Sequence, residues 1–274
     1  SSPKPARTSA TVGGSIATDA GGALALRHGT MRRRVVGLEF VLADGSVVSR
    51  MDGLLKDNAG LDLPALLIGS EGTLGVITAA RLQLERAAGP RLAALFGLAG
   101  LDQALALLTR LRAVAGLEAV DFFDAACMRL VSEARGLRDP LGGEHELYVI
   151  AQLEGEGDLA AELADALDPL PFDPDVAVAE STTDRERLWA FRELINESIR
   201  ELGVPHKLDV AVPLARLPAF VAGAGEAVGD ARLFLYGHLG DGNVHVNVLG
   251  AGEKVDERIL RLATGLGGTI SAEH

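Results

Sequence analysis

Residues 236–248, YGHLGDGNVHVNV, hold two of the six histidines in this chain of 274 residues. Polar and apolar residues alternate on both sides of Gly-Asp-Gly-Asn, and this alternation predicts the two strands of a β-hairpin. If Asp241-Gly242 is a two-residue turn, His238 lies opposite His245, with Cβ atoms about 5 Å apart. The two imidazole rings would then face the same point.

Two interpretations of this histidine pair are open. Strand histidines are often held by hydrogen bonds and play a structural part. A metal site needs at least three protein ligands, and the final residues ISAEH supply a carboxylate in Glu273 and an imidazole in His274. A His-His-Glu set with an open position is typical of catalytic metal sites. The spacing of the residues does not decide between these interpretations.

A helix predicted over residues 184–202 supplies the next polar cluster. Thr183 and Glu186 have capping-box spacing, and Gly203 marks its end. One face forms an apolar stripe, made of Leu188, Phe191, Ile195, Ile199 and Leu202. A second face carries Trp189, Arg192 and Asn196. In the strand predicted at 207–212, Lys207 and Asp209 share one face. Arg192 is therefore either a solvated helix arginine or part of an anion site.

Two glycine-containing segments precede residue 80. Residues 13–22, GGSIATDAGG, contain four glycines and predict a loop. Residues 66–78, LLIGSEGTLGVIT, predict a strand, a glycine-rich turn and then a strand or short helix. Neither segment matches the Rossmann or P-loop phosphate motif, so a nucleotide bound here would be held by backbone N–H groups of loops.

Composition narrows the class of protein. Apolar residues make up 48% and charged residues 23%, as in a globular protein, and the net charge of −12 argues against a nucleic-acid partner. The single cysteine, Cys127, cannot form an internal disulfide, which fits a reducing compartment. No apolar run reaches the roughly 18 residues of a membrane span, and no leader opens the chain. A cytoplasmic location with no transmembrane segment is therefore expected.

The pattern of elements changes near Pro90. Before it, residues 35–48 predict a hairpin that turns at Asp44-Gly45. After it, strands near 91–98, 118–124, 146–153, 175–180, 207–212 and 232–238 alternate with helices from 101, at 158–167 and at 253–265. This pattern predicts an α+β fold with an antiparallel sheet that helices cover on one face. We expect one domain over residues 1–89 and another over 90–274.

Four motifs occur in a fixed order: GGSIATDAGG, GSEGTLGVIT, GHLGDGNVH and SAEH. In this order the chain resembles the FAD-dependent 2-hydroxyacid dehydrogenases of the vanillyl-alcohol oxidase superfamily. The resemblance implies that residues 1–89 are the second half of an FAD-binding domain. It implies that residues 90–274 are a substrate (cap) domain whose last segment returns to the flavin. It also implies that an N-terminal part and a continuation beyond SAEH are missing from this sequence.

The resemblance implies FAD contacts from both glycine-containing segments and from the hairpin. The residues concerned are Gly13, Gly14, Ala17, Thr18, Gly21, Glu71, Gly72, Gly75, Val76, Ile77 and Asn243. Small side chains at these positions would let backbone donors approach the cofactor. Ser15 and Asp19 stand where the family usually has asparagine.

The resemblance also assigns roles to the polar residues of the second domain. His238, His245 and Glu273 would bind a divalent metal, either zinc or manganese or iron. Arg192 and Lys207 would hold the substrate carboxylate. Asn247 would belong to the catalytic set, with His274 as the base. Asn196 stands where hydroxyglutarate enzymes carry threonine.

The function expected from this resemblance is oxidation of a small D-2-hydroxy acid, such as D-lactate, glycolate or D-2-hydroxyglutarate, to its 2-oxo acid. Hydride would pass to the flavin, and an electron-transfer flavoprotein, a quinone or a cytochrome would reoxidise it. A homodimer is compatible with this expectation. Two other functions compete with it: a metal-dependent hydrolase that uses the same His-His-Glu centre, and a non-catalytic module that binds anions.

Overall fold

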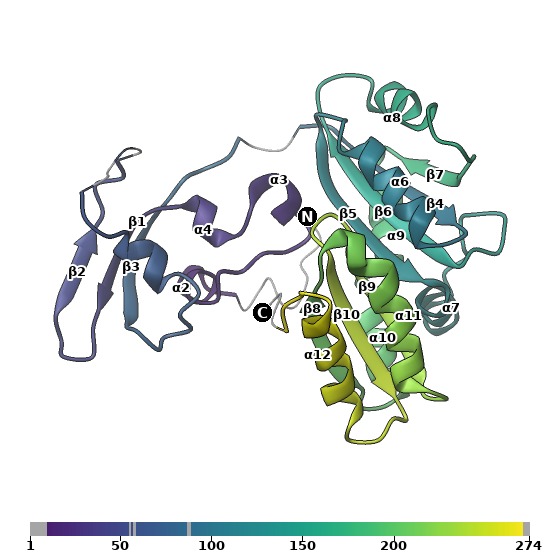
Figure 1. The fold of residues 1–274 in the computed structure, drawn as a ribbon. Coiled ribbons are helices and arrows are strands. Elements are labelled where there is room, and N and C mark those ends of the chain that lie inside the picture. The colour runs from purple at the N-terminus through teal and green to yellow at the C-terminus, as the bar shows by residue number, and fades with distance from the viewer. Residues whose placement is uncertain (1–9, 55, 57–58, 87–88, 271–274) are drawn as a thin grey trace. The chain divides into compact units, whose positions relative to one another are not determined.

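The computed structural model describes residues 10–54, 56, 59–86 and 89–270 (Figure 1). These residues form two compact units, the first up to residue 86 and the second from residue 89. Glu273 and His274, the predicted third metal ligand and the predicted base, lie outside the described residues. No helix in the described ranges is long and apolar enough to span a membrane.

The first unit is built on a three-stranded antiparallel sheet of order β2-β1-β3. Its strands are β1 (Val35–Val41), β2 (Val47–Arg50) and β3 (Val76–Leu82). Its helices are α2 (Val12–Ala17), α3 (Ala25–His28), α4 (Met31–Arg34) and α5 (Leu63–Leu67). The apolar core consists of Ile16, Leu38, Phe40, Leu67 and Ile68.

The hairpin at Asp44-Gly45 is confirmed, with Gly45 at φ +85° and the Ser46 N–H donating to Asp44 Oδ1 at 2.9 Å. Two other predictions for this unit are wrong. Part of the loop predicted at 13–22 is helix α2, because the Thr11 hydroxyl caps it by accepting from the Gly14 N–H at 3.0 Å. The strand predicted to begin at 66 is the end of α5, which Asp62 caps.

The second unit contains a seven-stranded sheet of order β7-β4-β6-β5-β9-β10-β8, antiparallel throughout. The strands are β4 (Arg91–Leu98), β5 (Leu117–Asp124), β6 (Leu147–Glu154), β7 (Asp175–Ala179), β8 (His206–Ala211), β9 (Arg232–His238) and β10 (Asn243–Leu249). The predicted α+β fold with an antiparallel sheet is confirmed.

Helices cover both faces of this sheet, so the prediction of a single covered face is wrong (Figure 1). One face packs against α7 (Ala125–Arg135), α9 (Thr182–Glu193) and α10 (Ile195–Leu202). The other packs against α6 (Leu101–Leu111), α8 (Leu159–Leu167), α11 (Leu217–Val228) and α12 (Val255–Gly265), with a short 3-10 turn η1 (Leu214–Arg216) before α11. The physical reason is that β4, β5 and β6 consist mostly of apolar residues, and nearly all of their residues are buried whichever face they point to.

The helix predicted over 184–202 is two helices, α9 and α10, separated at Leu194. The first begins after Ser181, whose hydroxyl accepts from the Asp184 N–H at 3.1 Å, and not at the predicted Thr183 cap. Gly203 ends the second helix as predicted. Leu202, predicted to belong to the core stripe, is 44% exposed.

Candidate active site

A row of polar side chains crosses four adjacent strands on the face covered by α7, α9 and α10. In the strand register, Asp121 of β5 pairs with His238 of β9, and His245 of β10 pairs with Asp209 of β8. Residues paired in an antiparallel sheet point to the same face. The valines of β10 occupy the opposite face, where Val244, Val246 and Val248 are fully buried.

The predicted pairing of His238 with His245 is wrong by two residues. His238 pairs with Asn243 and His245 pairs with Tyr236, so the connecting loop is residues 239–242. The reason is that the Gly240 N–H donates to the Val120 carbonyl of β5 at 3.3 Å, while Leu239 is fully buried. A shift of two residues keeps both histidines on one face. Their ring centroids lie 5.6 Å apart, so the predicted convergence is present.

A carboxylate contacts each of the two histidine rings. His238 Nδ1 is 2.8 Å from Asp121 Oδ1, and His245 Nδ1 is 3.2 Å from Asp209 Oδ2. A carboxylate that accepts the Nδ1 proton fixes the tautomer and leaves the lone pair on Nε2, an arrangement typical of metal-binding histidines. Among the described residues, no group of three histidine, cysteine or acidic side chains has the geometry of a metal site.

Arg192 approaches this row from α9. Its Nε lies 2.9 Å from Asp121 Oδ2, and its guanidinium carbon lies 4.7 Å from the centroid of the Tyr236 ring. Its side chain is 12% exposed. Among the described residues no side chain or carbonyl makes an aligned hydrogen bond with this guanidinium group, whose contact with Asp121 is an ion pair. The guanidinium group is thus oriented by the protein and still able to bind an anion.

Asp121 is ionised in this arrangement. Burial by itself raises the pKa of a carboxyl group, but the neighbouring His238 ring and the Arg192 guanidinium group outweigh it and hold the pKa of Asp121 below its ordinary value. Asp121 therefore supplies the negative charge of the buried ion pair with Arg192.

Tyr236 and Asn247 form a hydrogen-bonded pair beside the histidines. The Tyr236 hydroxyl donates to Asn196 Oδ1 at 2.7 Å and accepts from Asn247 Nδ2 at 3.1 Å. Burial raises the pKa of Tyr236, so its hydroxyl stays protonated. Asn247 is 1% exposed, and its Oδ1 atom accepts no hydrogen bond from any described residue. An unpaired buried acceptor is costly, and a bound ligand with a donor would satisfy it.

Two further predicted residues lie near this cluster with different surroundings. The Asn243 amide donates to Asp209 Oδ1 at 2.6 Å and to the Val210 carbonyl at 3.3 Å, so its donor is used inside the second unit. Lys207 pairs with Asn247 in the register of β8 and β10, but its side chain is exposed. Lys207 therefore shares the face of the site without joining its hydrogen bonds.

In the first unit, the structure brings the two glycine-containing segments together. The Gly69 N–H donates to the Ile16 carbonyl at 3.1 Å, and the Glu71 N–H donates to the Ala17 carbonyl at 2.9 Å. A Cβ atom at Gly72 would meet no atom within 4 Å. The surface over this turn is therefore open to a cofactor that approaches the backbone.

The remaining predicted FAD contacts lie around this turn. Gly13, Gly14 and Ala17 belong to α2, Thr18 caps its end, and Gly21 follows in the chain. Gly75 is held against Val41, whose carbonyl oxygen would lie 2.8 Å from an added Cβ. Val76 is 67% exposed, but Ile77 packs against the core of this unit, so only its backbone can face a ligand.

Asp19 adopts the left-handed conformation, with φ at +52°, which asparagine and aspartate tolerate better than most residues. Its carboxylate accepts hydrogen bonds from the N–H and Nε of Arg32 at 2.8 and 3.0 Å. Asp19 thus fits this backbone position as asparagine would, and its side chain is used within the first unit.

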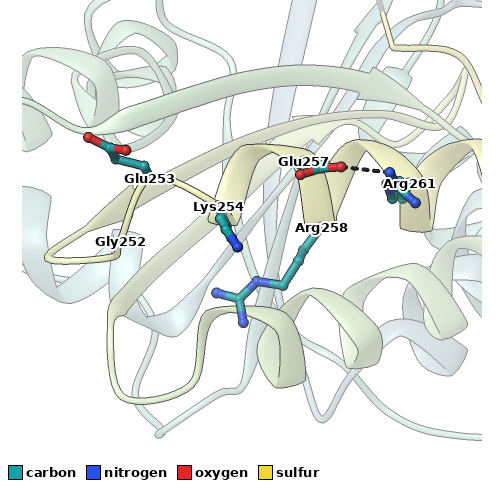
Figure 2. Close-up of a pocket in the computed structure, with 6 residues that line it drawn as sticks. All are labelled: Gly252, Glu253, Lys254, Glu257, Arg258 and Arg261. Atoms are coloured by element: carbon teal, nitrogen blue, oxygen red, sulfur yellow. Dashed lines mark hydrogen bonds and ion pairs between the residues drawn. The ribbon is translucent and has the colours of Figure 1, made fainter.

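A hollow of about 670 Å³ lies at the start of α12, and its lining differs chemically from the histidine site (Figure 2). Its lining residues are Gly252, Glu253, Lys254, Glu257, Arg258 and Arg261. Glu257 and Arg261 form an ion pair at 2.6 Å, and charges of both signs share the surface. None of the predicted site residues lines it.

Asp121 is the site residue that sequence reasoning missed. The available signal was an acidic residue inside the apolar strand segment AVDFF, residues 119–123. A carboxylate in a strand buried on both faces requires a partner, and this requirement marks it for attention.

Comparison with known proteins identifies the family. Residues 90–274 match the family model for FAD linked oxidases, C-terminal domain, and residues 2–50 match an FAD binding domain. The chain belongs to the FAD linked oxidases. The resemblance inferred from the four motifs is therefore confirmed.

Curated relatives of this FAD linked oxidase chain include a mitochondrial D-2-hydroxyglutarate dehydrogenase of Bos taurus, 38% identical over 98% of this chain and 52% of its own length. A D-lactate dehydrogenase of Archaeoglobus fulgidus is 34% identical over 99% of this chain and 62% of its own length. The chain thus spans roughly half to three fifths of these relatives. A solved alkyldihydroxyacetonephosphate synthase structure shares the fold, with a TM-score of 0.70 at 16% identity over 94% of this chain and 53% of its own.

Proposed function

We propose that the protein containing this chain oxidises a small D-2-hydroxy acid to the 2-oxo acid. The observation that carries the proposal is the convergence of Arg192, the two carboxylate-bound histidines and the unpaired Asn247 oxygen on one face. In this reaction, the α-carbon loses a hydride, the hydroxyl loses a proton, and the remaining electron pair forms the carbonyl. The names of the relatives support this substrate class.

We assign roles to the residues of the second unit as follows. Arg192 binds the substrate carboxylate through Nη1 and Nη2, because Asp121 occupies its Nε. Asn247 Oδ1 accepts a hydrogen bond from the C2 hydroxyl of the bound acid until that proton is removed. His274 would take the hydroxyl proton, and Lys207 would add positive charge at the rim. This arrangement fixes the α-carbon in one orientation.

FAD and a divalent metal complete this proposal. Residues 1–89 would form part of the FAD-binding domain, and residues 90–274 would form the substrate domain. The open turn at residues 69–72 leaves room for a cofactor that is bound by backbone groups. The two oriented imidazoles fit metal coordination, with Glu273 as the proposed third ligand. When bound, FAD supplies a hydride acceptor, and zinc, manganese or iron supplies a Lewis acid for the substrate oxygens.

The size of the substrate is part of the same proposal. The D-lactate and D-2-hydroxyglutarate named for the relatives share a C1 carboxylate and a C2 hydroxyl, which Arg192 and the histidine centre would contact. Asn196 accepts a hydrogen bond from the Tyr236 hydroxyl, so its oxygen is not free to orient a distal carboxylate.

The electron acceptor, the cytoplasmic location and the homodimer stay predictions.

Anaerobic reduction of the flavin tests the proposed function. The full-length protein, purified with FAD, is mixed with D-lactate, glycolate or D-2-hydroxyglutarate, and bleaching of the oxidised flavin absorbance is followed. We expect bleaching with at least one of these acids, and none with L-lactate or L-2-hydroxyglutarate. Absence of bleaching with all of them, together with metal-dependent ester or amide hydrolysis, would favour the hydrolase instead.

A further inference from the structure

Asp121 contacts two site residues that come from different elements. It lies in β5 with its side chain 2% exposed. Its Oδ1 is 2.8 Å from Nδ1 of His238 in β9, and its Oδ2 is 2.9 Å from Nε of Arg192 in α9. One carboxylate thus holds, with one oxygen each, a residue of the histidine centre and the arginine of the anion site.

The contacts of Arg192 define the orientation of its guanidinium group. The ion pair at Nε fixes the edge that faces β5, and the Tyr236 ring at 4.7 Å fixes the plane. Among the described residues, no side chain or carbonyl makes an aligned hydrogen bond with Nη1 or Nη2. A guanidinium group fixed in this way can bind a carboxylate without first losing rotational freedom.

Asp209 occupies the corresponding position on the other side of the histidine pair. It contacts His245 at 3.2 Å and the Asn243 amide at 2.6 Å. No contact joins Asp209 to Arg192 in the described structure. The two carboxylates therefore differ in one respect that can be tested. Asp121 contacts both a histidine and Arg192, whereas Asp209 contacts a histidine but not Arg192.

We propose that Asp121 is a positioning residue that couples carboxylate binding to the histidine centre. It orients Arg192 for the substrate carboxylate and His238 for its ligand at the same time. This proposal rests on the proposed function. An asparagine in its place keeps the shape but removes the negative charge that attracts Arg192. Its NH2 group would face either the cationic guanidinium group, whose Nε has no aligned acceptor, or the His238 Nδ1–H, so one of the two contacts would be lost.

The test uses the full-length protein with FAD bound. The dissociation constant of 2-oxoglutarate, or of pyruvate if that acid pair is the active one, is measured from the flavin absorbance after chelation of metal. Zinc affinity is measured separately by competition with a chelator. For Asp121→Asn we expect 2-oxo acid binding about 10-fold weaker or more, on the scale of a hydrogen bond to a charged group. We expect zinc binding about 10- to 100-fold weaker.

Two variants are matched controls. Asp209→Asn should weaken zinc binding to a similar degree and leave 2-oxo acid binding in the metal-free protein unchanged. Glu118→Gln removes a fully buried carboxylate from the same strand β5. This carboxylate contacts none of the site residues and accepts hydrogen bonds from Arg91 Nε and Nη2 at 2.7 and 2.9 Å. It should change neither binding constant.

A double variant tests whether Asp121 acts through Arg192. If it does, adding Asp121→Asn to Arg192→Lys should weaken 2-oxo acid binding no further than Arg192→Lys alone. If Asp121→Asn does not fold, Asp121→Glu keeps the charge and moves both oxygens by one methylene group. Wild-type affinity for zinc and the 2-oxo acid in that variant would overturn the proposal.

The outcomes separate the two proposals. A wild-type protein whose flavin no D-2-hydroxy acid reduces overturns the proposed function. A wild-type protein that is reduced, with Asp121→Asn binding the 2-oxo acid as tightly as the wild type, overturns only the positioning role. An equal loss of 2-oxo acid binding in Glu118→Gln overturns it as well, because the effect would then come from general destabilisation of β5.

Discussion

Replacing Tyr236 with phenylalanine would test the hydrogen bonds beside the histidines. The side chain is 1% exposed, and its hydroxyl bridges Asn196 and Asn247. Phenylalanine fills nearly the same volume, and its ring can still lie under the guanidinium group of Arg192. The substitution therefore removes hydrogen bonds with little change in packing.

The loss of stability in Tyr236→Phe follows from the buried Asn247 amide that the substitution leaves without a partner. Asn247 is buried, its Oδ1 already has no partner among the described residues, and the variant leaves its Nδ2 without one too. A buried donor that loses its partner costs about 1 to 3 kcal/mol. Asn196 is only partly buried and can bond to water instead. We expect the free energy of unfolding of the second unit to fall by about 1 to 3 kcal/mol, a large part of a typical total.

Urea unfolding followed by Trp189 fluorescence measures this change. Trp189 is the only tryptophan of the chain and packs against the core of the second unit, so its signal reports on that unit. Tyr148→Phe is the matched control, since Tyr148 is the other tyrosine and is 4% exposed. Its hydroxyl donates to Asp139 at 3.0 Å, and water can replace it at this partly buried carboxylate, so we expect a loss of about 1 kcal/mol.

The comparison of the two variants decides the result. If Tyr236→Phe unfolds at the same urea concentration as Tyr148→Phe or at a higher one, the Asn247 amide is not left unsatisfied. The reasoning that assigns its oxygen to a ligand would then fail.

Three other predictions concern the second unit. Arg192→Lys replaces a planar fork with a point charge and should weaken hydroxy acid binding by about 1 to 3 kcal/mol, and an unchanged Michaelis constant for every acid tested would remove Arg192 from the site. His245→Ala should lower metal content in elemental analysis with little loss of stability, because the valine face of β10 is untouched; unchanged metal content would contradict this. Burial raises the pKa of Asp124, so the stability it contributes is present below its ordinary pKa of 3.8 and is lost as pH rises through the raised value. The unfolding midpoint of wild type relative to Asp124→Asn should therefore fall with rising pH, and a constant difference would refute it.

The sequence predicted much of the secondary structure correctly, because local patterns reflect local physics. Alternation of polar and apolar residues placed His238, His245 and Asn247 on one face, and the structure agrees because the two-residue shift in register keeps that parity. Glycine at Gly203 ended the helix as expected, since helix termination depends on neighbouring backbone groups. The ordered motifs were sufficient to identify the family.

Other features depend on contacts between residues far apart in the chain. The hairpin register was set by Gly240 bonding to Val120, and the helices on both faces reflect strands that the chain packs into the middle of the sheet. Asp121 and His238 are 117 residues apart in the chain and 2.8 Å apart in space. Sequence periodicity assigns each residue to a face of its own strand, but strand order decides which faces become neighbours. The tertiary structure alone therefore determined that one buried carboxylate would contact both an arginine and a histidine of the site.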